Sequence, residues 1–257
     1  IKLVEAGNIS FPSNSSLIKG ASSLFGIRTD MQFGKLKLQT VLSQKKSATK
    51  SVSSKGGTQL TPFEINVADY EENRHFFLAH YFRDIYDKAM STLPNITTGI
   101  KITRVEIWVT NKTGTTSNSR NVIALTDLGE GAHVSKPLWG GDTSLPPSNT
   151  ANSEYQQMTT QYADARNIDK TSSVLATIPD FEGGVDYEKV QSARLLTSSE
   201  YTLNSALGYV SLKSTLQTDQ VLAVAYEYTL GGRTYQVGEF STDRQDASEA
   251  LFVKSLK

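Results

Sequence analysis

Apolar and polar residues alternate most clearly at residues 25–43. The apolar positions of this segment are Phe25, Ile27, Met31, Phe33, Leu36, Leu38 and Leu42. Polar or charged residues occupy most of the positions between them. A two-residue turn at residues 34–35 would pair Phe33 with Leu36 and place the whole apolar set on one face. The pattern therefore predicts an N-terminal β-hairpin with one apolar face and one polar face.

Two kinds of protein use a hairpin of this pattern. Each arm is about nine residues long, and a tilted membrane-spanning β-strand has ~9–11 residues with apolar side chains facing lipid. A half-buried hairpin of a water-soluble sheet shows the same alternation. A single hairpin cannot span a membrane by itself, because its edges would leave backbone groups unpaired in lipid. We expect the apolar face to pack inside this chain, with a second copy of the chain as the alternative cover.

Apolar residues at helical spacing follow at residues 69–91. This stripe consists of Leu78, Tyr81, Phe82, Ile85 and Ala89. Asp69 and Glu72 resemble a capping box at the start of a helix, and the Leu93-Pro94 step marks its end. The spacing predicts one long helix over residues 69–91 that is covered on more than one side.

Short β-type runs dominate the rest of the chain. Strands are predicted at residues 100–110, 121–128, 190–196, 200–203, 209–212, 221–230 and 233–240. Residues 221–230 are nearly all apolar, which is typical of a central strand. A turn at Gly231-Gly232 would pair Tyr228 with Tyr235. A short helix is predicted at residues 152–166.

These elements predict a β-rich α+β fold with antiparallel, sandwich-like sheets. Residues 1–61 would form an irregular segment (1–24), the hairpin and a polar Lys/Ser/Gly loop (43–61). Residues 62–257 would form a β-rich α+β module, with a candidate internal boundary in the Pro-rich loop near residues 145–150.

Composition narrows the possible functions. The chain has 257 residues, with 26 Lys plus Arg and 26 Asp plus Glu, so its net charge is zero. A nucleic-acid-binding protein would show a basic excess. The absence of cysteine excludes disulfides, thiolate zinc sites and cysteine nucleophiles. No apolar run approaches the ~18–20 residues of a spanning helix. Because the sequence starts at Ile1 without a signal peptide, we interpret it as a fragment of a longer protein.

No motif in the sequence indicates a catalytic or cofactor site. The GxSxG, P-loop, dinucleotide and HExxH patterns are all missing. Glu72 and His75 have the E-x-x-H spacing of a metal site on a helix, but di-iron bundles need two such motifs and two further glutamates. We therefore predict no metal site and no cofactor.

Four residues are candidates for an interaction surface. Trp108 shares one face of a predicted strand with Arg104 and Glu106, and Trp139 stands beside glycines in a loop. Either indole could be a platform for a sugar or a partner protein, or could pack in a core. Two further residues, Arg74 and His75 of the predicted helix, complete this candidate surface.

The segment FEINVADYEENRHFFLAHYFRDIYDKAMSTLP, residues 63–94, resembles the SprA/Sov family. Its order of Glu, Asn, Arg, His and aromatic residues is the most specific part of the resemblance. Residues 24–47, 100–114 and 120–130 are also similar, and residues 200–212 and 221–241 more weakly so. The members of this family are very large outer-membrane translocons of the Bacteroidetes type IX secretion system, also described as gliding-motility or cell-surface proteins.

The resemblance implies a non-enzymatic role at the outer membrane or cell surface. The family protein is a giant β-barrel that passes folded cargo across the outer membrane, together with a plug protein and a PorV-type accessory barrel. The chain would be a structural and interaction module of this translocon, in contact with a membrane only within its parent. The apolar hairpin face would meet lipid there, and the polar face would line the lumen. The alternatives are a carbohydrate-binding cell-surface domain and a hydrolase with unrecognised carboxylates.

Overall fold

The computed structural model forms two compact units, residues 1–64 and residues 65–257, which are considered separately below. The structure describes residues 2–11, 21–43, 66, 69–114, 116–244 and 246–257. Most of the predicted polar loop at 43–61 lies outside these residues. Residues 145–150 lie within the second unit, and no boundary between compact units falls there.

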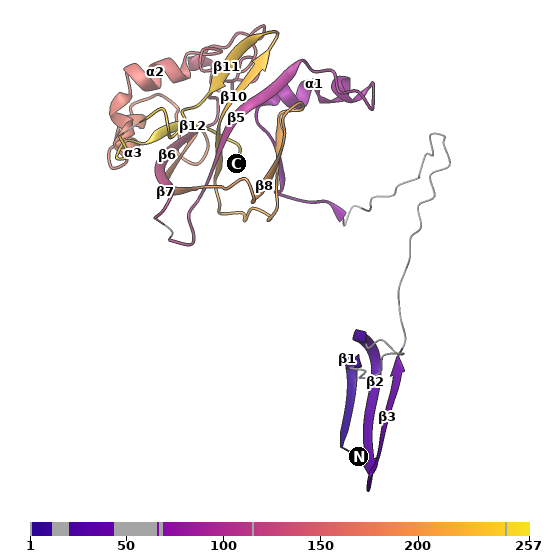
Figure 1. Cartoon of the computed structure of the whole chain (residues 1–257). Coiled ribbons are helices and arrows are strands. Elements are labelled where there is room, and N and C mark those ends of the chain that lie inside the picture. Colours follow the sequence, from indigo (N-terminus) through magenta and orange to yellow (C-terminus); the bar gives the residue numbers. More distant parts are fainter. Residues whose placement is uncertain (1, 12–20, 44–65, 67–68, 115, 245) are drawn as a thin grey trace. The chain divides into compact units, whose positions relative to one another are not determined.

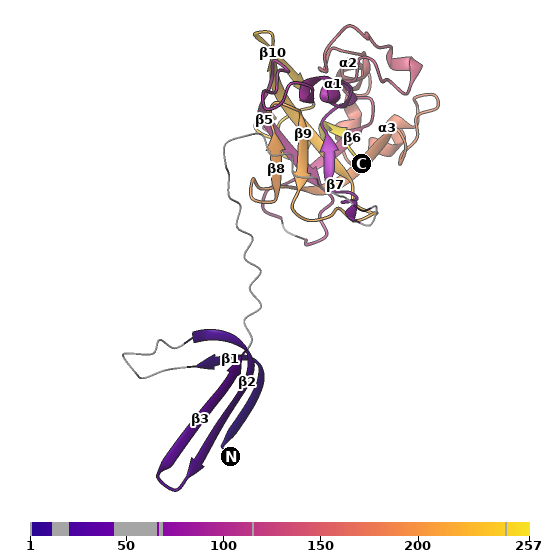
Figure 2. The same cartoon turned by 90° about the vertical axis from the view of Figure 1, so that its right-hand side faces the viewer.

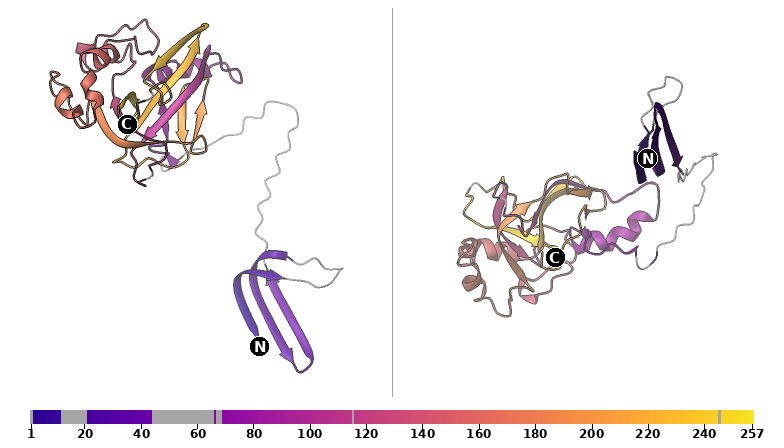
Figure 3. Two further views of the ribbon diagram at one scale, coloured as in Figure 1. Left: turned by 60° about the vertical axis from the view of Figure 1, so that its left-hand side comes forward. Right: turned by 90° about the horizontal axis from the view of Figure 1, so that it is seen from below.

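The first unit is a three-stranded antiparallel sheet in the order β1-β2-β3. Its strands are β1 (Leu3–Phe11), β2 (Ala21–Phe33) and β3 (Leu36–Ser43), and they run side by side (Figures 2 and 3). β2 and β3 form the predicted hairpin, and Phe33 pairs with Leu36 as expected. Gly34 adopts a positive φ of 60° at the turn, a conformation that glycine adopts without strain.

Strand β1 was not predicted, because residues 1–24 were expected to be irregular. The strand pairs Val4 with Thr29 and Ala6 with Ile27 of β2. Its sequence, LVEAGNISF, includes Gly7 and Asn8, two residue types that are rare in strands. These residues interrupt the alternation, so pairing with β2 rather than local pattern defines this strand.

The second unit contains nine strands and five short helices among its described residues (Figure 1). The strands are β4 (His75–Phe77), β5 (Ile100–Val109), β6 (Ser119–Leu125), β7 (Tyr187–Leu195), β8 (Tyr201–Asn204), β9 (Tyr209–Leu212), β10 (Leu222–Leu230), β11 (Arg233–Val237) and β12 (Leu251–Ser255). The helices are α1 (His80–Met90), η2 (Pro137–Trp139), α2 (Glu154–Thr160), η3 (Ala163–Arg166) and α3 (Thr171–Leu175). The unit is β-rich and mostly antiparallel, as predicted.

Five of these strands close into a barrel, which corrects the prediction of a sandwich. The ring runs β10-β12-β6-β7-β5, and β5 pairs back onto β10. A ring with an odd number of strands cannot alternate direction throughout, and β12 and β6 are the parallel pair. The interior is narrow. Small and aliphatic residues line it beside two large aromatic ones; these are Ala124, Ala193, Ala223, Ala225, Val122, Val190, Val253, Leu251, Trp108 and Phe240.

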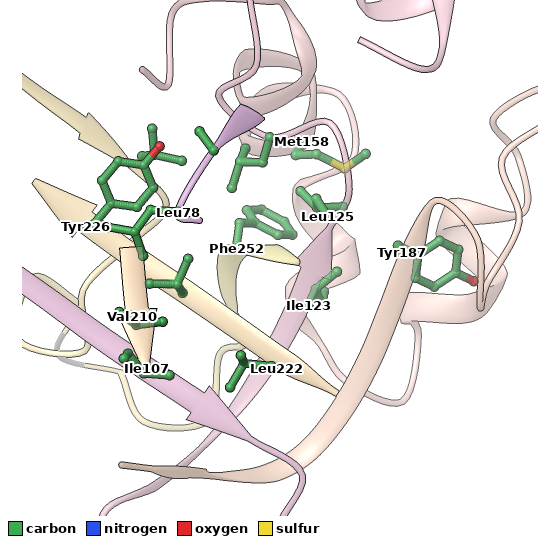
Figure 4. Packing of buried hydrophobic residues seen from close by; sticks show 14 of the residues in the cluster. Leu78, Ile107, Ile123, Leu125, Met158, Tyr187, Val210, Leu222, Tyr226 and Phe252 are labelled. Atoms are coloured by element: carbon green, nitrogen blue, oxygen red, sulfur yellow. The ribbon is translucent and has the colours of Figure 1, made fainter. Parts of the chain in front are cut away.

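The outer surface of the barrel carries a second and larger core. Side chains alternate along β10, so that Ala223 and Ala225 point into the ring while Val224 and Tyr226 point outward. The outward residues pack against α1, the β4-β9-β8 sheet and the α2–α3 segment, and several of them converge in Figure 4. Because β10 is covered on both sides, nearly all of its residues are apolar, as the sequence indicated.

The predicted long helix is wrong in its first half. Helix α1 begins at His80 rather than Asp69, and residues 75–77 form strand β4. β4 pairs with β9, with Phe76 opposite Val210. Residues 78–89 carry the predicted apolar stripe, in which Leu78, Phe82 and Ala89 are buried. Pairing with a strand more than a hundred residues away overrode the helical spacing, so there is no capping box and no E-x-x-H face on a helix.

The predicted helix at residues 152–166 is divided in the structure. Residues 154–160 form α2, and residues 163–166 form the 3₁₀ turn η3. Between them, the amide of Tyr162 donates to the carbonyl of Gln157, which ends the α-helical pattern. The boundaries differ from the prediction, but the segment is helical where expected.

Candidate functional site

The first unit carries a large exposed apolar face. Six side chains of the predicted hairpin face are between 47% and 70% exposed. These are Phe25, Ile27, Phe33, Leu36, Leu38 and Leu42, and Met31 lies on the same face at intermediate exposure. Val4 of β1, at 58% exposure, extends the face onto the third strand because it pairs with Thr29. A water-soluble surface of this size rarely carries so many apolar side chains together.

The opposite face of the same sheet is polar and internally paired. The Arg28 guanidinium lies 2.7 Å from the Asp30 carboxylate and 3.8 Å from Glu5 of β1. The hydrogen bond from Arg28 lowers the pKa of Asp30. Gln32 donates to the carbonyl of Gly34 at 3.0 Å. The sheet therefore has two faces of opposite character, each continuous across neighbouring strands.

The expectation that the apolar face packs into an internal core is not met within this unit. Its described residues form a single layer of three strands, with no second layer over the sheet. A single sheet has no apolar partner to bury one of its faces against. The described residues of this unit therefore leave the face open to an environment or partner outside them.

Neither tryptophan contributes to an exposed interaction surface. Trp108 is 1% exposed and fills the interior of the barrel. Arg104 and Glu106 share its face as predicted, but Arg104 lies over the Phe240 ring at 3.7 Å and Glu106 accepts a hydrogen bond from the Ser241 amide. Because the strands close into a barrel, this face of β5 points into the barrel interior at Trp108 and toward the barrel rim at Arg104 and Glu106.

Trp139 is also 1% exposed and packs edge-to-face with Phe181 at 5.5 Å. Of the two roles left open for this residue, a binding platform or core packing, the structure shows the second, because η2 directs its indole into the outer core of the barrel. A sugar platform on either tryptophan is therefore excluded by burial in the second unit.

Arg74 and His75 do come together, at the start of β4. Both contact the carboxylate of Glu71, and His75 Nε2 lies 2.8 Å from Glu71 Oε2. His75 Nδ1 is 2.8 Å from Ser211 Oγ, and Arg74 Nε donates to the carbonyl of Leu212 at 3.1 Å. These bonds tie β4 to β9. Part of each side chain stays exposed, so the pair can also meet a partner.

A cleft that the sequence analysis missed lies beside this cluster. It has a volume of about 420 Å³ and is lined by His75, Phe77, Arg83, Tyr86, Asp87 and Tyr209. These residues come from the neighbouring elements β4 and α1 and from β9, which follows more than a hundred residues later. The cleft depends on the β4–β9 pairing, with Phe77 opposite Tyr209, which no local pattern in the sequence indicates.

The second unit also contains buried carboxylates, the feature that would favour a hydrolase if it lay in an open cleft. Asp127, Glu154 and Asp186 are between 0% and 5% exposed. Asp127 accepts two backbone N–H bonds at 2.8 Å, and Asp186 accepts one from Glu182. A substrate in solvent has no access to these groups. They act within the core, and burial raises the pKa of Glu154 well above its ordinary value.

The described part of the chain contains no group of three or more His, Asp or Glu side chains placed to hold a metal ion. None of its described helices combines the length and hydropathy needed to span a membrane.

A comparison with protein families identifies the relatives of this chain. A family model described as motility related/secretion protein, SprA_N, matches residues 1–228. The chain belongs to the SprA family. The match covers both compact units, so the exposed apolar sheet and most of the barrel module are parts of one SprA-family region. No curated protein matches the chain.

Proposed function

We propose that this chain is a non-enzymatic structural and interaction module of a protein-secretion translocon in the outer membrane, acting in type IX secretion and gliding motility. Membership of a motility- and secretion-related family supports the general role. The two-faced sheet of the first unit is the observation that supports the specific one.

In the full-length parent, the apolar face of this sheet contacts lipid and the polar face contacts the aqueous conduit. The strand lengths support this assignment for β1 and β2, which have 9 and 13 residues against the ~9–11 that a membrane-spanning strand needs, whereas β3 with 8 is one residue short. Lipid is also the environment in which exposed Phe, Ile and Leu side chains stabilise the folded state.

The second unit provides a rigid body that other components of the translocon contact. Buried apolar side chains fill both the barrel interior and the outer core, which suits this unit to be a scaffold. The expected partners are a plug protein, a PorV-type accessory barrel and secreted cargo. The expected location is the outer membrane or cell surface.

Two adjacent residues of β2 provide a test. Met31 lies on the apolar face opposite Leu38, and Gln32 lies on the polar face opposite Lys37. An arginine facing lipid costs up to ~2–4 kcal/mol at the membrane midplane and less toward the interface near the turn, whereas positions facing the conduit tolerate charge. In the full-length protein, Met31→Arg should lower the amount assembled in the outer membrane and the amount of cargo secreted. Gln32→Arg should have little effect on either.

The isolated chain serves as the control for folding. Since the apolar face is exposed in this unit, both substitutions should leave the thermal unfolding of the purified chain nearly unchanged. Equal tolerance of the two substitutions in cells would contradict the proposed contact with lipid.

A further inference from the structure

We propose that the cleft between α1 and the β4-β9 edge of the second unit is a binding site for an uncharged saccharide. The cleft is lined by the six residues named above, and its volume of about 420 Å³ falls within the range of small-molecule sites in proteins. This role is separate from the translocon role proposed above and rests on different residues.

Aromatic side chains form the wall of the cleft. Phe77 lies 5.5 Å from Tyr86 and 5.9 Å from Tyr209, measured between ring centroids, and Tyr86 lies 6.5 Å from Tyr209. Tyr86 of α1 contacts one ring from each of the two strands. All three rings are partly exposed. Part of the surface of each ring is therefore left uncovered by the core.

The orientation of the rings favours stacking with a ligand. The three ring planes meet at 66° to 77°, close to mutually perpendicular. Whatever the direction in which the cleft opens, at least one ring must then turn part of its face toward it. Aromatic faces carry negative charge density, and the C–H groups on one side of a sugar ring are weakly positive. A saccharide can pack on such a face.

Polar groups surround the aromatic wall. Arg83 and Asp87 stand four residues apart on α1 and flank Tyr86 on the same helix face. Arg83 supplies hydrogen-bond donors and Asp87 supplies acceptors, which together match hydroxyl groups. The imidazole of His75 is fixed by its bonds to Glu71 and Ser211 and forms the remaining wall.

The charged side chains that line the cleft favour a neutral ligand over a cationic or an acidic one. A quaternary ammonium ion would suit aromatic faces and would be attracted by Asp87, but it has no hydrogen-bond donor or acceptor to offer Arg83 or Asp87. An acidic ligand would pair with Arg83 but would be repelled by Asp87. A neutral ligand with many hydroxyl groups satisfies both side chains, so the lining fits a hexose or N-acetylhexosamine unit best.

The test is a binding measurement on the purified chain. NMR titrations would use neutral disaccharides of hexose and N-acetylhexosamine units, with glucuronic acid and tetramethylammonium as charged comparisons. We expect at least one neutral disaccharide to bind and to shift the resonances of Tyr86 and Tyr209. Binding of none of the disaccharides, or tighter binding of either charged probe, would overturn the proposal.

Variants on the exposed surface of α1 locate the site. Asp87→Ala and Arg83→Gln should each weaken disaccharide binding about tenfold or more, because each removes hydrogen bonds to a charged group. The matched controls are Lys88→Gln on the same helix and Glu72→Ala at an exposed position before β4, which remove charges of the same signs outside the cleft. Equal weakening by the controls, or no weakening by the cleft variants, would show that sugar binds elsewhere. Circular dichroism of each variant confirms that it is folded.

Discussion

Glu154 makes the stability of the second unit depend on pH in a direction opposite to that of most carboxylates. It is the first residue of α2 and is 0% exposed. Neither of its carboxylate oxygens has a hydrogen-bond partner among the described residues. Burial, and then the nearby carboxylate of Asp127, raise its pKa well above the ordinary value. Lys254 opposes this rise, but its ammonium group is already 3.0 Å from Glu130.

The sign of the effect follows from the two states of the chain. In the unfolded chain Glu154 loses its proton near pH ~4.3, whereas in the folded chain it keeps the proton to higher pH. Above the unfolded pKa the folded state binds more protons, so the free energy of unfolding falls as the pH rises. The fall is about 1.4 kcal/mol per pH unit and ends when the folded pKa is reached.

Replacing Glu154 by glutamine removes this titration at almost constant shape. We expect Glu154→Gln to raise the free energy of unfolding at pH 7, because folding of the variant no longer requires a proton to be bound above the unfolded pKa. The rise is at most about 4 kcal/mol, since about 1.4 kcal/mol per pH unit applies between pH ~4.3 and 7. At about pH 4 both side chains are neutral in the folded state, and the difference should be small.

Urea unfolding of the wild-type and variant chains near pH 4 and at pH 7 measures this difference. Comparing the two chains at each pH cancels the contribution of every other titrating group. Glu72→Gln, at an exposed glutamate, is the control and should show no such dependence. A variant that is less stable than wild type at pH 7 would show that the folded state holds Glu154 ionised and paired, which would refute the reasoning.

Two further substitutions test the outer core of the barrel. Phe82 is 0% exposed and packs between Tyr226 and Tyr228, so Phe82→Ala should lower the free energy of unfolding by about 3–5 kcal/mol in urea melts; an unchanged melt would place this ring outside the core. Gly208 has a φ of +66°, and a Cβ there would lie 2.5 Å from the Phe82 ring. Gly208→Ala should therefore cost about 2 kcal/mol or more, and the double variant with Phe82→Ala should cost clearly less than the sum of the two single costs.

The elements predicted correctly from the sequence depend on local pattern. The β2–β3 register follows from alternation and from a turn that contains Gly34. The β10–β11 hairpin follows from Gly231-Gly232, and Tyr228 pairs with Tyr235 as expected. In both cases the partner strands are adjacent in the chain, so the period of two and the turn residues contain the whole of the information.

Two of the errors arise where partners are distant in the sequence. Residues 75–77 lie in a segment with helical spacing, but they pair with β9 more than a hundred residues later. Trp108 shares a strand face with charged residues, and only the closure of the barrel makes that face an interior. The spacing of residues within one segment does not indicate which other segment covers it. The exposure of residues 75–77 and of Trp108 could therefore not be inferred from the sequence.

The two candidate sites differ in how far the sequence predicts them, and the reason is the same. The apolar face of the first unit is largely predictable because most of its residues belong to one hairpin, and its exposure follows from the single layer that the described residues of that unit form. The α1–β4–β9 cleft exists only after β4 pairs with β9 and after α1 brings Tyr86 against Phe77. The error in the predicted helix therefore also hid the cleft, because a continuous helix over residues 69–91 would have carried Phe77 and Tyr86 on one element and left Tyr209 without a partner.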